Sequence, residues 1–247
     1  MSKDFCIKIA DCLFNISPMY DYSRELCRGY ICDSSSDSHS HIKISKEDID
    51  FEKKKCEKES QLKGMETPHY GDDYFESLAI CRKISHKLID YDTLLFHGSA
   101  LELDGEAYLF IAKSGTGKST HARLWREHFG NRVTMINDDK PFLKITEKGV
   151  TVYGSPWNGK HRLDNNISAP LRAIAILEQD TDNHILRIDK RSALPMLYQQ
   201  SFRPNESGLL SKSMSLIDRL GDNVALYKLG CNMEPDAASV SYRGMNS

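Results

Sequence analysis

Hydrophobic and polar residues alternate at the start of the chain. Apolar side chains recur at every second position over residues 5–9, and another apolar stretch covers residues 13–16, which predicts two short strands. A third strand-like stretch, residues 42–44, follows a run rich in Ser and Asp. Residues 46–59 then mix acidic and basic side chains almost evenly, which is typical of a solvated connection. We therefore expect a small β-rich N-terminal domain and linker over residues 1–70.

The remaining pattern predicts a larger domain over residues 71–247. Apolar residues recur at helical spacing over residues 74–89. Beyond them we expect strands at residues 94–96, 99–103, 107–111, 133–136, 174–177, 185–188 and 224–229, two more within residues 142–152, and helices at residues 119–129, 191–200 and 206–220. Because adjacent hairpins replace a regular alternation of strand and helix, the pattern favours a mixed α/β (α+β) fold over a doubly wound sheet.

A glycine-rich segment joins the apolar strand at residues 107–111 to the helix at residues 119–129. Its sequence, Ala-Lys-Ser-Gly-Thr-Gly-Lys-Ser over residues 112–119, matches a Walker A phosphate loop, and the strand and helix supply the context that such a loop requires. Gly115 and Gly117 let the backbone turn so that several N–H groups face one concavity, next to the positive end of the helix. Ala112 replaces the first glycine of the usual pattern, which leaves the path of the chain into the loop open.

This loop predicts a binding site for a nucleoside triphosphate and Mg²⁺. Lys118 is expected to reach the β- and γ-phosphates, and the hydroxyl of Ser119 is expected to join the Mg²⁺ shell. The residues expected to bind the nucleotide are Ser114, Gly115, Thr116, Gly117, Lys118, Ser119 and Thr120.

Two adjacent acids, Asp138 and Asp139, follow the apolar strand at residues 133–136, near where a parallel neighbour of the loop's strand would end. Successive side chains of an extended segment point to opposite sides, so one carboxylate can face an acceptor hydroxyl as a base while the other faces the metal. A polar turn before Pro141 is the alternative interpretation. His97 precedes the strand pair that leads to the loop, and in the sequence alone a structural role is the simpler reading of a single histidine.

A loop punctuated by Gly and Pro covers residues 153–162. It carries an indole, an amide and cations, which suit the binding of an acceptor or of the γ-phosphate. The candidate substrate-binding residues are Trp157, Asn158, Lys160 and Arg162. The alternative is a surface turn in which Trp157 packs on the core.

Taken in order, His97-Gly98, residues 114–120 and Asn137-Asp138-Asp139 resemble the catalytic domain of HPr kinase/phosphorylase and its relatives. Residues 114–118 also resemble the phosphate loop of phosphoenolpyruvate carboxykinase, whose fold that domain shares. The resemblance runs from about residue 94 to the C-terminus. It implies a P-loop core of this type, with ATP and Mg²⁺ as cofactors, Asp138 as the catalytic acid/base, Asp139 and Ser119 near the metal, and Lys118 and His97 at the transferred phosphoryl group.

The chain departs from that family in two places. It has no counterpart of the Arg-Pro-Gly-Arg-Asn stretch with which HPr kinases engage their substrate, and its N-terminal part is unlike theirs. HPr is therefore not the expected acceptor. Shortened members of the family are similar to kinases found beside ribosomally made, modified peptides, so the resemblance implies a Ser or Thr hydroxyl on a peptide, or on a small molecule, as the acceptor.

Overall charge and composition narrow the class of protein. A formal net charge of −2 provides no broad basic field, so nucleic acid is not an expected partner. No apolar run is long enough for a membrane span, and charged residues interrupt the N-terminus where a signal peptide needs apolar ones, so we expect a cytoplasmic protein. The seven cysteines are expected to be reduced thiols, and no zinc site is expected among them.

The sequence thus predicts an ATP-dependent kinase that transfers the γ-phosphoryl group to a Ser or Thr hydroxyl. Two alternatives stay open: a non-catalytic regulatory module that binds ATP, and a phosphorylase acting in the reverse direction. The choice between ATP and GTP, and the formation of a homo-oligomer, are also left open by the sequence.

Overall fold

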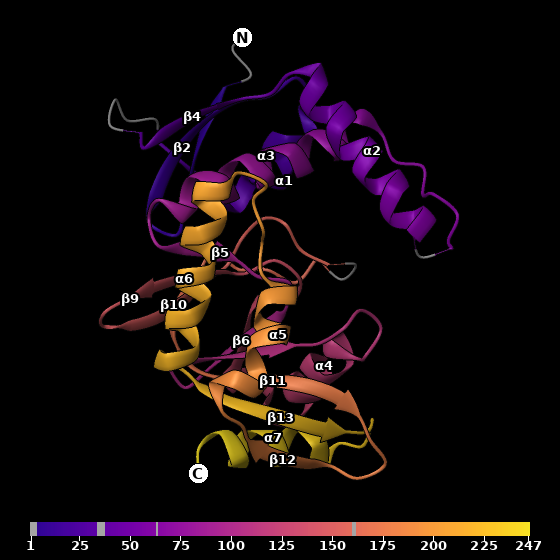
Figure 1. Ribbon diagram of the computed structural model, residues 1–247, viewed down its shortest axis with the longest axis vertical. Helices are drawn as coiled ribbons and strands as arrows, with labels where there is room; N and C mark the ends of the chain where they lie inside the picture. The colour runs from indigo at the N-terminus through magenta and orange to yellow at the C-terminus, as the bar shows by residue number, and fades with distance from the viewer. Residues whose placement is uncertain (1–3, 34–37, 63, 160–161) are drawn as a thin grey trace. The chain divides into compact units, whose positions relative to one another are not determined.

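The computed structural model describes residues 4–33, 38–62, 64–159 and 162–247 (Figure 1). It divides the chain into two compact units, Met1–Leu88 and Ile89–Ser247. Both combine helices with β-sheet, so the predicted mixed α/β fold with a small β-rich N-terminal part is confirmed. None of the helices in the described ranges combines the length and the apolar character that crossing a membrane requires.

The N-terminal unit is built on a four-stranded sheet. The strand order is β3 (Ile31–Cys32), β1 (Phe5–Ile9), β2 (Cys12–Ser17) and β4 (Ser40–Lys43). The two strands predicted near the N-terminus are confirmed as the antiparallel pair β1 and β2, whose alternate residues Ile7, Phe14 and Ile16 are buried. Helix α1 (Tyr22–Leu26) and the 3-10 turn η1 (Arg28–Tyr30) connect β2 to β3.

The prediction that residues 46–59 form a connection is wrong, although many of them are exposed, as a solvated stretch requires. These residues lie in helix α2 (Lys46–Leu62), whose acidic side chains pair with cations of α3 (Asp72–Ile89), the helix predicted over residues 74–89. Lys83 Nζ lies 2.6 Å from Asp48 Oδ2, and Arg82 Nε lies 2.5 Å from Glu52 Oε1. The mixed charges therefore link two helices, a role that composition does not distinguish from solvation.

Helix α3 also holds the turn after β2. The carboxylate of Glu76, a fully buried residue, accepts hydrogen bonds from Ser23 Oγ at 2.7 Å and from the backbone N–H of Tyr20 at 3.2 Å. Because of these contacts, most of α3 belongs to the same compact unit as the residues before it. They do not show where an independently folding domain would end, so the boundary at residue 70 stays a prediction.

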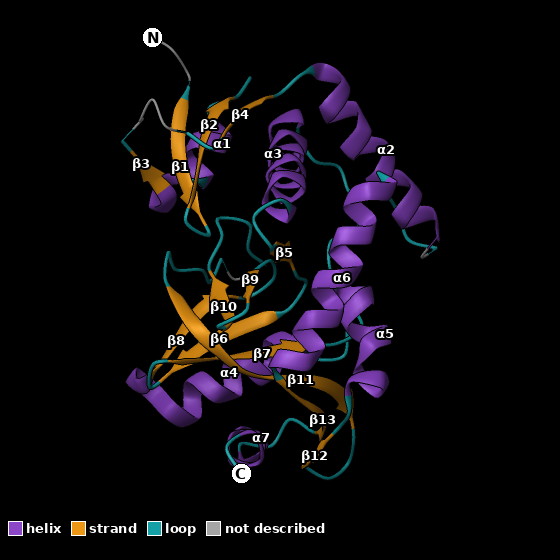
Figure 2. Cartoon of the chain, turned by 60° about the vertical axis from the view of Figure 1, so that its left-hand side comes forward, coloured by secondary structure: helices purple, strands orange, loops and turns teal. Residues whose placement is uncertain are grey.

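The C-terminal unit contains a nine-stranded mixed sheet, whose strands are the orange arrows in the lower part of Figure 2. Seven strands lie in the order β5 (Thr93–Leu95), β9 (Phe142–Thr146), β10 (Gly149–Tyr153), β11 (Ser168–Gln179), β7 (Glu106–Ile111), β6 (Ser99–Leu103) and β8 (Val133–Asn137). β13 (Ala225–Cys231) pairs with β11, and β12 (His184–Arg187) pairs with β13. The strands β7, β11 and β13 run parallel, while the hairpins are antiparallel.

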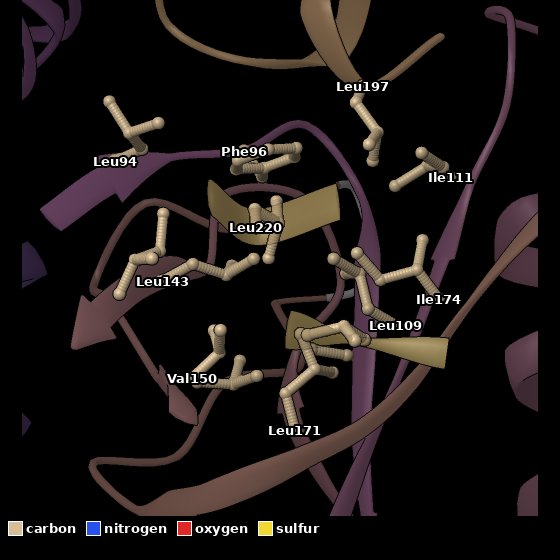
Figure 3. Packing of buried hydrophobic residues seen from close by; sticks show 14 of the residues in the cluster. Leu94, Phe96, Leu109, Ile111, Leu143, Val150, Leu171, Ile174, Leu197 and Leu220 are labelled. Carbon is tan, nitrogen blue, oxygen red and sulfur yellow. The ribbon is translucent and has the colours of Figure 1, made fainter. Parts of the chain in front are cut away.

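Helices cover both faces of the central strands, with α5 and α7 on opposite sides of β11 and β13 (Figure 1). Along β7, Leu109 and Ile111 enter one core layer, and Tyr108 and Phe110 enter the other. The first layer includes α5 (Lys190–Gln200) and α6 (Ser207–Asn223), and Figure 3 shows Leu197 and Leu220 of these helices among the sheet side chains. The second layer includes α4 (Lys118–Phe129) and α7 (Asp236–Met245), of which the sequence pattern did not predict α7.

We expect His121 of α4 to make folding sensitive to acid. Burial lowers the pKa of His121 to about 3 from an ordinary value of 6.5, because the ring lies against Phe110 in the second core layer and its Nε2 reaches only Ser241 Oγ, at 3.1 Å. The unfolded chain therefore takes up the proton first, so the stability that neutral His121 contributes is complete above the unfolded pKa of about 6.5 and falls as the pH drops toward 3. At about pH 5 the loss is about 2 kcal/mol relative to about pH 7.5.

Urea unfolding at both pH values measures this effect. His121→Gln should lose less free energy of unfolding on acidification than the wild type does, whereas His128→Gln, on an exposed position of the same helix, should behave like the wild type. An unchanged acid loss in His121→Gln would assign the sensitivity to other groups.

Candidate functional site

The glycine-rich segment forms a tight turn between β7 and α4, as the sequence predicted. Gly115 and Gly117 have φ angles of 83° and 118°, which residues with a β-carbon rarely adopt. The N–H and the hydroxyl of Thr116 both donate to the carbonyl of Lys113, at 3.3 and 2.9 Å. Ala112 is fully buried in the second core layer, so a small apolar side chain fits where the usual motif has its first glycine. The turn therefore presents its backbone at the N-terminus of α4.

Lys118, the first residue of α4, is half-buried within this turn. Its Nζ donates to the carbonyl of Ala112 at 3.3 Å, and Lys118 forms no salt bridge with a residue in the described part of the chain. Burial lowers the pKa of Lys118, while the negative charge of Asp139 acts in the opposite direction. A partly desolvated ammonium group of this kind is stabilised by an anionic ligand.

Strand β8 brings the two acids to the same edge of the sheet as the glycine turn. β8 and β7 are both antiparallel to β6, which lies between them, so the two strands run parallel without being neighbours. The sequence had placed the acids near the end of a parallel neighbour of β7, and the strand between them corrects that detail. Because parallel strands end at a common edge, Asp138 and Asp139 still lie near the N-terminus of α4.

Asn137, which is fully buried, fixes the backbone around the acids. Its Oδ1 accepts the N–H groups of Asp139 at 2.8 Å and of Lys140 at 2.6 Å. Its Nδ2 donates to the carbonyls of Ser155 at 2.8 Å and of Trp157 at 3.2 Å. One amide thus ties the turn after β8 to the loop after β10. Asn is common in such turns, and this was the only signal in the sequence for that role.

Asp138 is almost fully buried, and its Oδ1 accepts the N–H of Gly159 at 2.6 Å. A β-carbon at Gly159 would come within 2.9 Å of Asp138 Oδ2, so glycine permits this close approach. Asp138 also lines a hollow of about 430 Å³ that contains Ser119 and Thr120. We call this the α4 hollow, and its other lining residues are Ala122, Arg123, Arg126, Met135 and Leu163. Asp138 and the start of α4 therefore border one space.

Asp139 has a different set of partners. Its Oδ1 lies 3.3 Å from His97 Nε2, and the ammonium group of Lys140 contacts its Oδ2. Burial raises the pKa of Asp139, but the hydrogen bonds and positive charges of His97 and Lys140 outweigh burial and hold the pKa well below its usual range. Asp139 is therefore ionised at neutral pH. The two neighbouring acids lie in different surroundings, but they lie in a bend after β8, which is the polar turn of the alternative interpretation and not an extended segment.

Gln200 is a member of the site that the sequence did not reveal. It is the last residue of α5 and is buried, and its carbonyl accepts the backbone N–H of His97 at 2.7 Å. Its side-chain Oε1 lies 2.8 Å from His97 Nδ1. His97 is thus held between Gln200 and Asp139. A glutamine far along the chain carries no motif that could have predicted this contact.

We expect Gln200 to be a positioning residue that acts through His97. Gln200→Leu removes the acceptor for Nδ1, so the phosphoryl-transfer rate that the sequence leads us to expect should fall about tenfold to hundredfold with little change in the KM for ATP, the scale typical of losing such an orienting partner. Gln200→Glu retains an acceptor and should keep most of the rate. The control is Gln199→Leu on the exposed neighbouring position. An equal fall in both leucine variants, with matching losses in melting temperature, would make the role of Gln200 structural.

A second hollow, of about 490 Å³, lies against the glycine turn itself. It is lined by Lys113, Ser114, Gly115 and Thr116 of the turn and by Leu177, Glu178, Gln179 and Met196. Gln179 Nε2 also donates to the carbonyl of Thr116 at 3.3 Å, which ties the end of β11 to the turn. The glycine turn therefore has open space beside it in which a ligand can bind.

The loop after β10 meets the site mainly through its backbone. Trp157 is buried, as the alternative interpretation of this loop expected, and Asn158 Nδ2 hydrogen-bonds to Asp164. Arg162 is exposed, with a φ of 49°, and Lys160 lies outside the described residues. It is Gly159, which was not singled out in the sequence, that contacts Asp138. The substrate roles expected of Trp157, Asn158, Lys160 and Arg162 stay predictions.

Of the comparisons with known proteins, the comparison with solved structures gives matches. No family model matches the sequence, and no curated protein matches it. Among solved structures, the chain is similar to the HPr(Ser) kinase/phosphatase from Coxiella burnetii. It shares 9% sequence identity with that protein at a TM-score of 0.36, over 61% of this chain and 95% of the other. This similarity is too distant to indicate an activity, which has to be inferred from the site itself.

Proposed function

We propose that the protein is an ATP-dependent kinase that transfers the γ-phosphoryl group to a hydroxyl. One observation carries the proposal: Ser119 and Thr120, at the start of the helix after the glycine turn, line the same hollow as Asp138. A glycine turn suited to phosphate and an acidic residue beside one space are what a phosphotransferase needs to hold a donor beside an acceptor.

The glycine turn is suited to bind the triphosphate. Its backbone N–H groups and the N-terminus of α4 favour an anion, and Lys118 has no carboxylate partner among the described residues. Bound phosphates would supply the countercharge that this half-buried ammonium lacks. His97, held by Gln200, adds a further polar group next to Asp139.

The residues present also fit Mg²⁺. Ser119, which lines the α4 hollow, and the ionised Asp139, at the same edge of the sheet, supply oxygen ligands of the type that Mg²⁺ prefers. Bound Mg²⁺ would neutralise the charge of the phosphates. Asp139 remains a candidate ligand because it is ionised, although in this structure His97 and Lys140 occupy its carboxylate.

Asp138 is the proposed base. In the transfer step the acceptor oxygen bonds to the γ-phosphorus while the bond from that phosphorus to the β–γ bridging oxygen breaks, so that ADP leaves and the hydroxyl proton passes to Asp138. The N–H of Gly159 and the turn held by Asn137 keep the carboxylate in place for this step. The proposed acceptor is a Ser or Thr hydroxyl, on a peptide in the first instance.

Transfer from radiolabelled ATP to a library of Ser- and Thr-containing peptides tests this function. We expect labelled phosphopeptide that requires Mg²⁺ and Asp138. ATP binding without label in any acceptor would favour a regulatory module instead. Formation of pyrophosphate from phosphate and a phosphopeptide would show that the reverse, phosphorylase direction operates.

A further inference from the structure

Two arginines extend the α4 hollow along the helix, away from the glycine turn. Ser119, Arg123 and Arg126 recur at helical spacing on the exposed side of α4, while His121, Leu124 and other residues of the opposite side are buried. Both arginines line the same hollow as Asp138. The hollow thus combines the proposed base with a stripe of positive charge.

Neither arginine forms an ion pair with a buried acid among the described residues. Arg123 Nη1 pairs with Glu127 Oε1 at 2.7 Å, but this i,i+4 pair is more than half exposed and weakened by solvent. Arg126 forms no ion pair with any residue that the structure describes. The same hollow is also lined by the apolar residues Ala122, Met135 and Leu163. A guanidinium group beside apolar side chains binds a planar anion such as a carboxylate well.

The spacing of this stripe sets a length. A helix rises about 1.5 Å per residue, so the Cα of Arg126 lies about 10 Å along the axis from that of Ser119. An extended peptide covers that distance in about three residues, at about 3.3–3.6 Å each. The positive stripe therefore matches an acceptor that carries a carboxylate within about three residues of its hydroxyl.

We propose that Arg123 and Arg126 select acidic acceptor peptides, in which a carboxylate lies within about three residues of the Ser or Thr that receives the phosphoryl group. The inference rests on the proposed kinase function, because it takes the α4 hollow as the acceptor side of the site. Asp138 then meets the hydroxyl, and the arginines hold the carboxylate farther along α4.

Peptide binding and peptide phosphorylation test the proposal separately. The probes are four fluorescent peptides of one length: a neutral peptide with an internal Ser, the same peptide with Asp after the Ser, a peptide ending in Ser with a free carboxylate, and its C-terminal amide. Binding is measured by anisotropy with a non-hydrolysable ATP analogue and Mg²⁺ present, and phosphorylation is measured as kcat/KM. The pairs distinguish a side-chain carboxylate from a terminal one.

We expect at least one carboxylate-bearing peptide to exceed its neutral partner by about tenfold to hundredfold in affinity and in kcat/KM. The double variant R123Q/R126Q should abolish that preference while leaving the KM for ATP unchanged. The matched control is Arg187→Gln, which removes the same charge from an exposed position on β12. Since all three positions are exposed, each variant should fold.

Two results would overturn the inference. One is equal binding of acidic and neutral peptides by the wild type. The other is a raised KM for ATP in R123Q/R126Q with the peptide preference intact, which would assign the hollow to the nucleotide. If acidic peptides bind through the arginines but no phosphoryl group is transferred, the kinase function fails while the acidic binding site stands.

Discussion

Lys118→Ala should abolish phosphoryl transfer and weaken ATP binding while leaving the protein folded. The ammonium group is half-buried, hydrogen-bonds only to the carbonyl of Ala112, and forms no salt bridge with a described residue, so its loss removes little from the folded state. Its loss does remove a half-buried cation at the glycine turn. We expect ATP affinity to fall about tenfold to hundredfold and the transfer rate to fall a further 10²-fold to 10³-fold, as when one preorganised donor is lost.

Calorimetric titration with ATP and Mg²⁺ measures the first effect, and single-turnover transfer measures the second. Lys148→Ala, on the exposed hairpin between β9 and β10, is the control for removal of a positive charge. Wild-type ATP affinity in Lys118→Ala would refute the assignment of the glycine turn as the phosphate site. Loss of folded structure, seen by circular dichroism, would instead show that Lys118 stabilises the turn.

The two neighbouring acids should respond differently to the same substitution. Asp138→Asn keeps the shape of the side chain and an oxygen that can accept from Gly159, but it removes the proposed proton acceptor. We expect nearly normal binding of ATP and a transfer rate that falls by about 10²-fold to 10⁴-fold. Asp139→Asn removes the anion that His97 and Lys140 share, and we expect it to raise the Mg²⁺ concentration needed for half-maximal activity.

A titration of activity with Mg²⁺ separates these phenotypes. Rescue of Asp138→Asn by excess metal, without rescue of Asp139→Asn, would exchange the two roles, which is a real alternative because Asp138 shares its hollow with Ser119. Wild-type activity in both variants would show that the carboxylate pair takes no part in the reaction.

Much of the larger unit could be predicted from local pattern. Period-two alternation and hairpin signals located β6, β7, β9 and β10, because these strands pair with sequence neighbours. The glycine turn was predictable for a similar reason: its strand, its glycines and its helix are contiguous. Strand alternation predicted that Asp138 and Asp139 diverge, but both lie in the bend after β8 that Asn137 holds, so the reason given by the sequence was wrong.

The parts that sequence reasoning missed depend on residues far apart in the chain. Gln200 contacts His97 across 103 positions, and no local pattern encodes that pairing. Gly159 lies in a loop whose sequence carries no signal that its N–H donates to Asp138. The charged stretch in α2 looked solvated because its partners Arg82 and Lys83 lie on another helix. Each of these contacts joins residues far apart in the chain, and secondary-structure propensity does not describe such contacts.

The most direct test of the kinase function is to measure the ADP and the phosphopeptide formed in one reaction. Wild-type protein is incubated with ATP, Mg²⁺ and an acidic Ser peptide, and both products are quantified by mass spectrometry beside Asp138→Asn and Lys118→Ala. We predict equal amounts of ADP and phosphopeptide from the wild type and almost none from either variant. ADP without phosphopeptide, or bound ATP that yields neither product with any hydroxyl acceptor, would contradict a kinase.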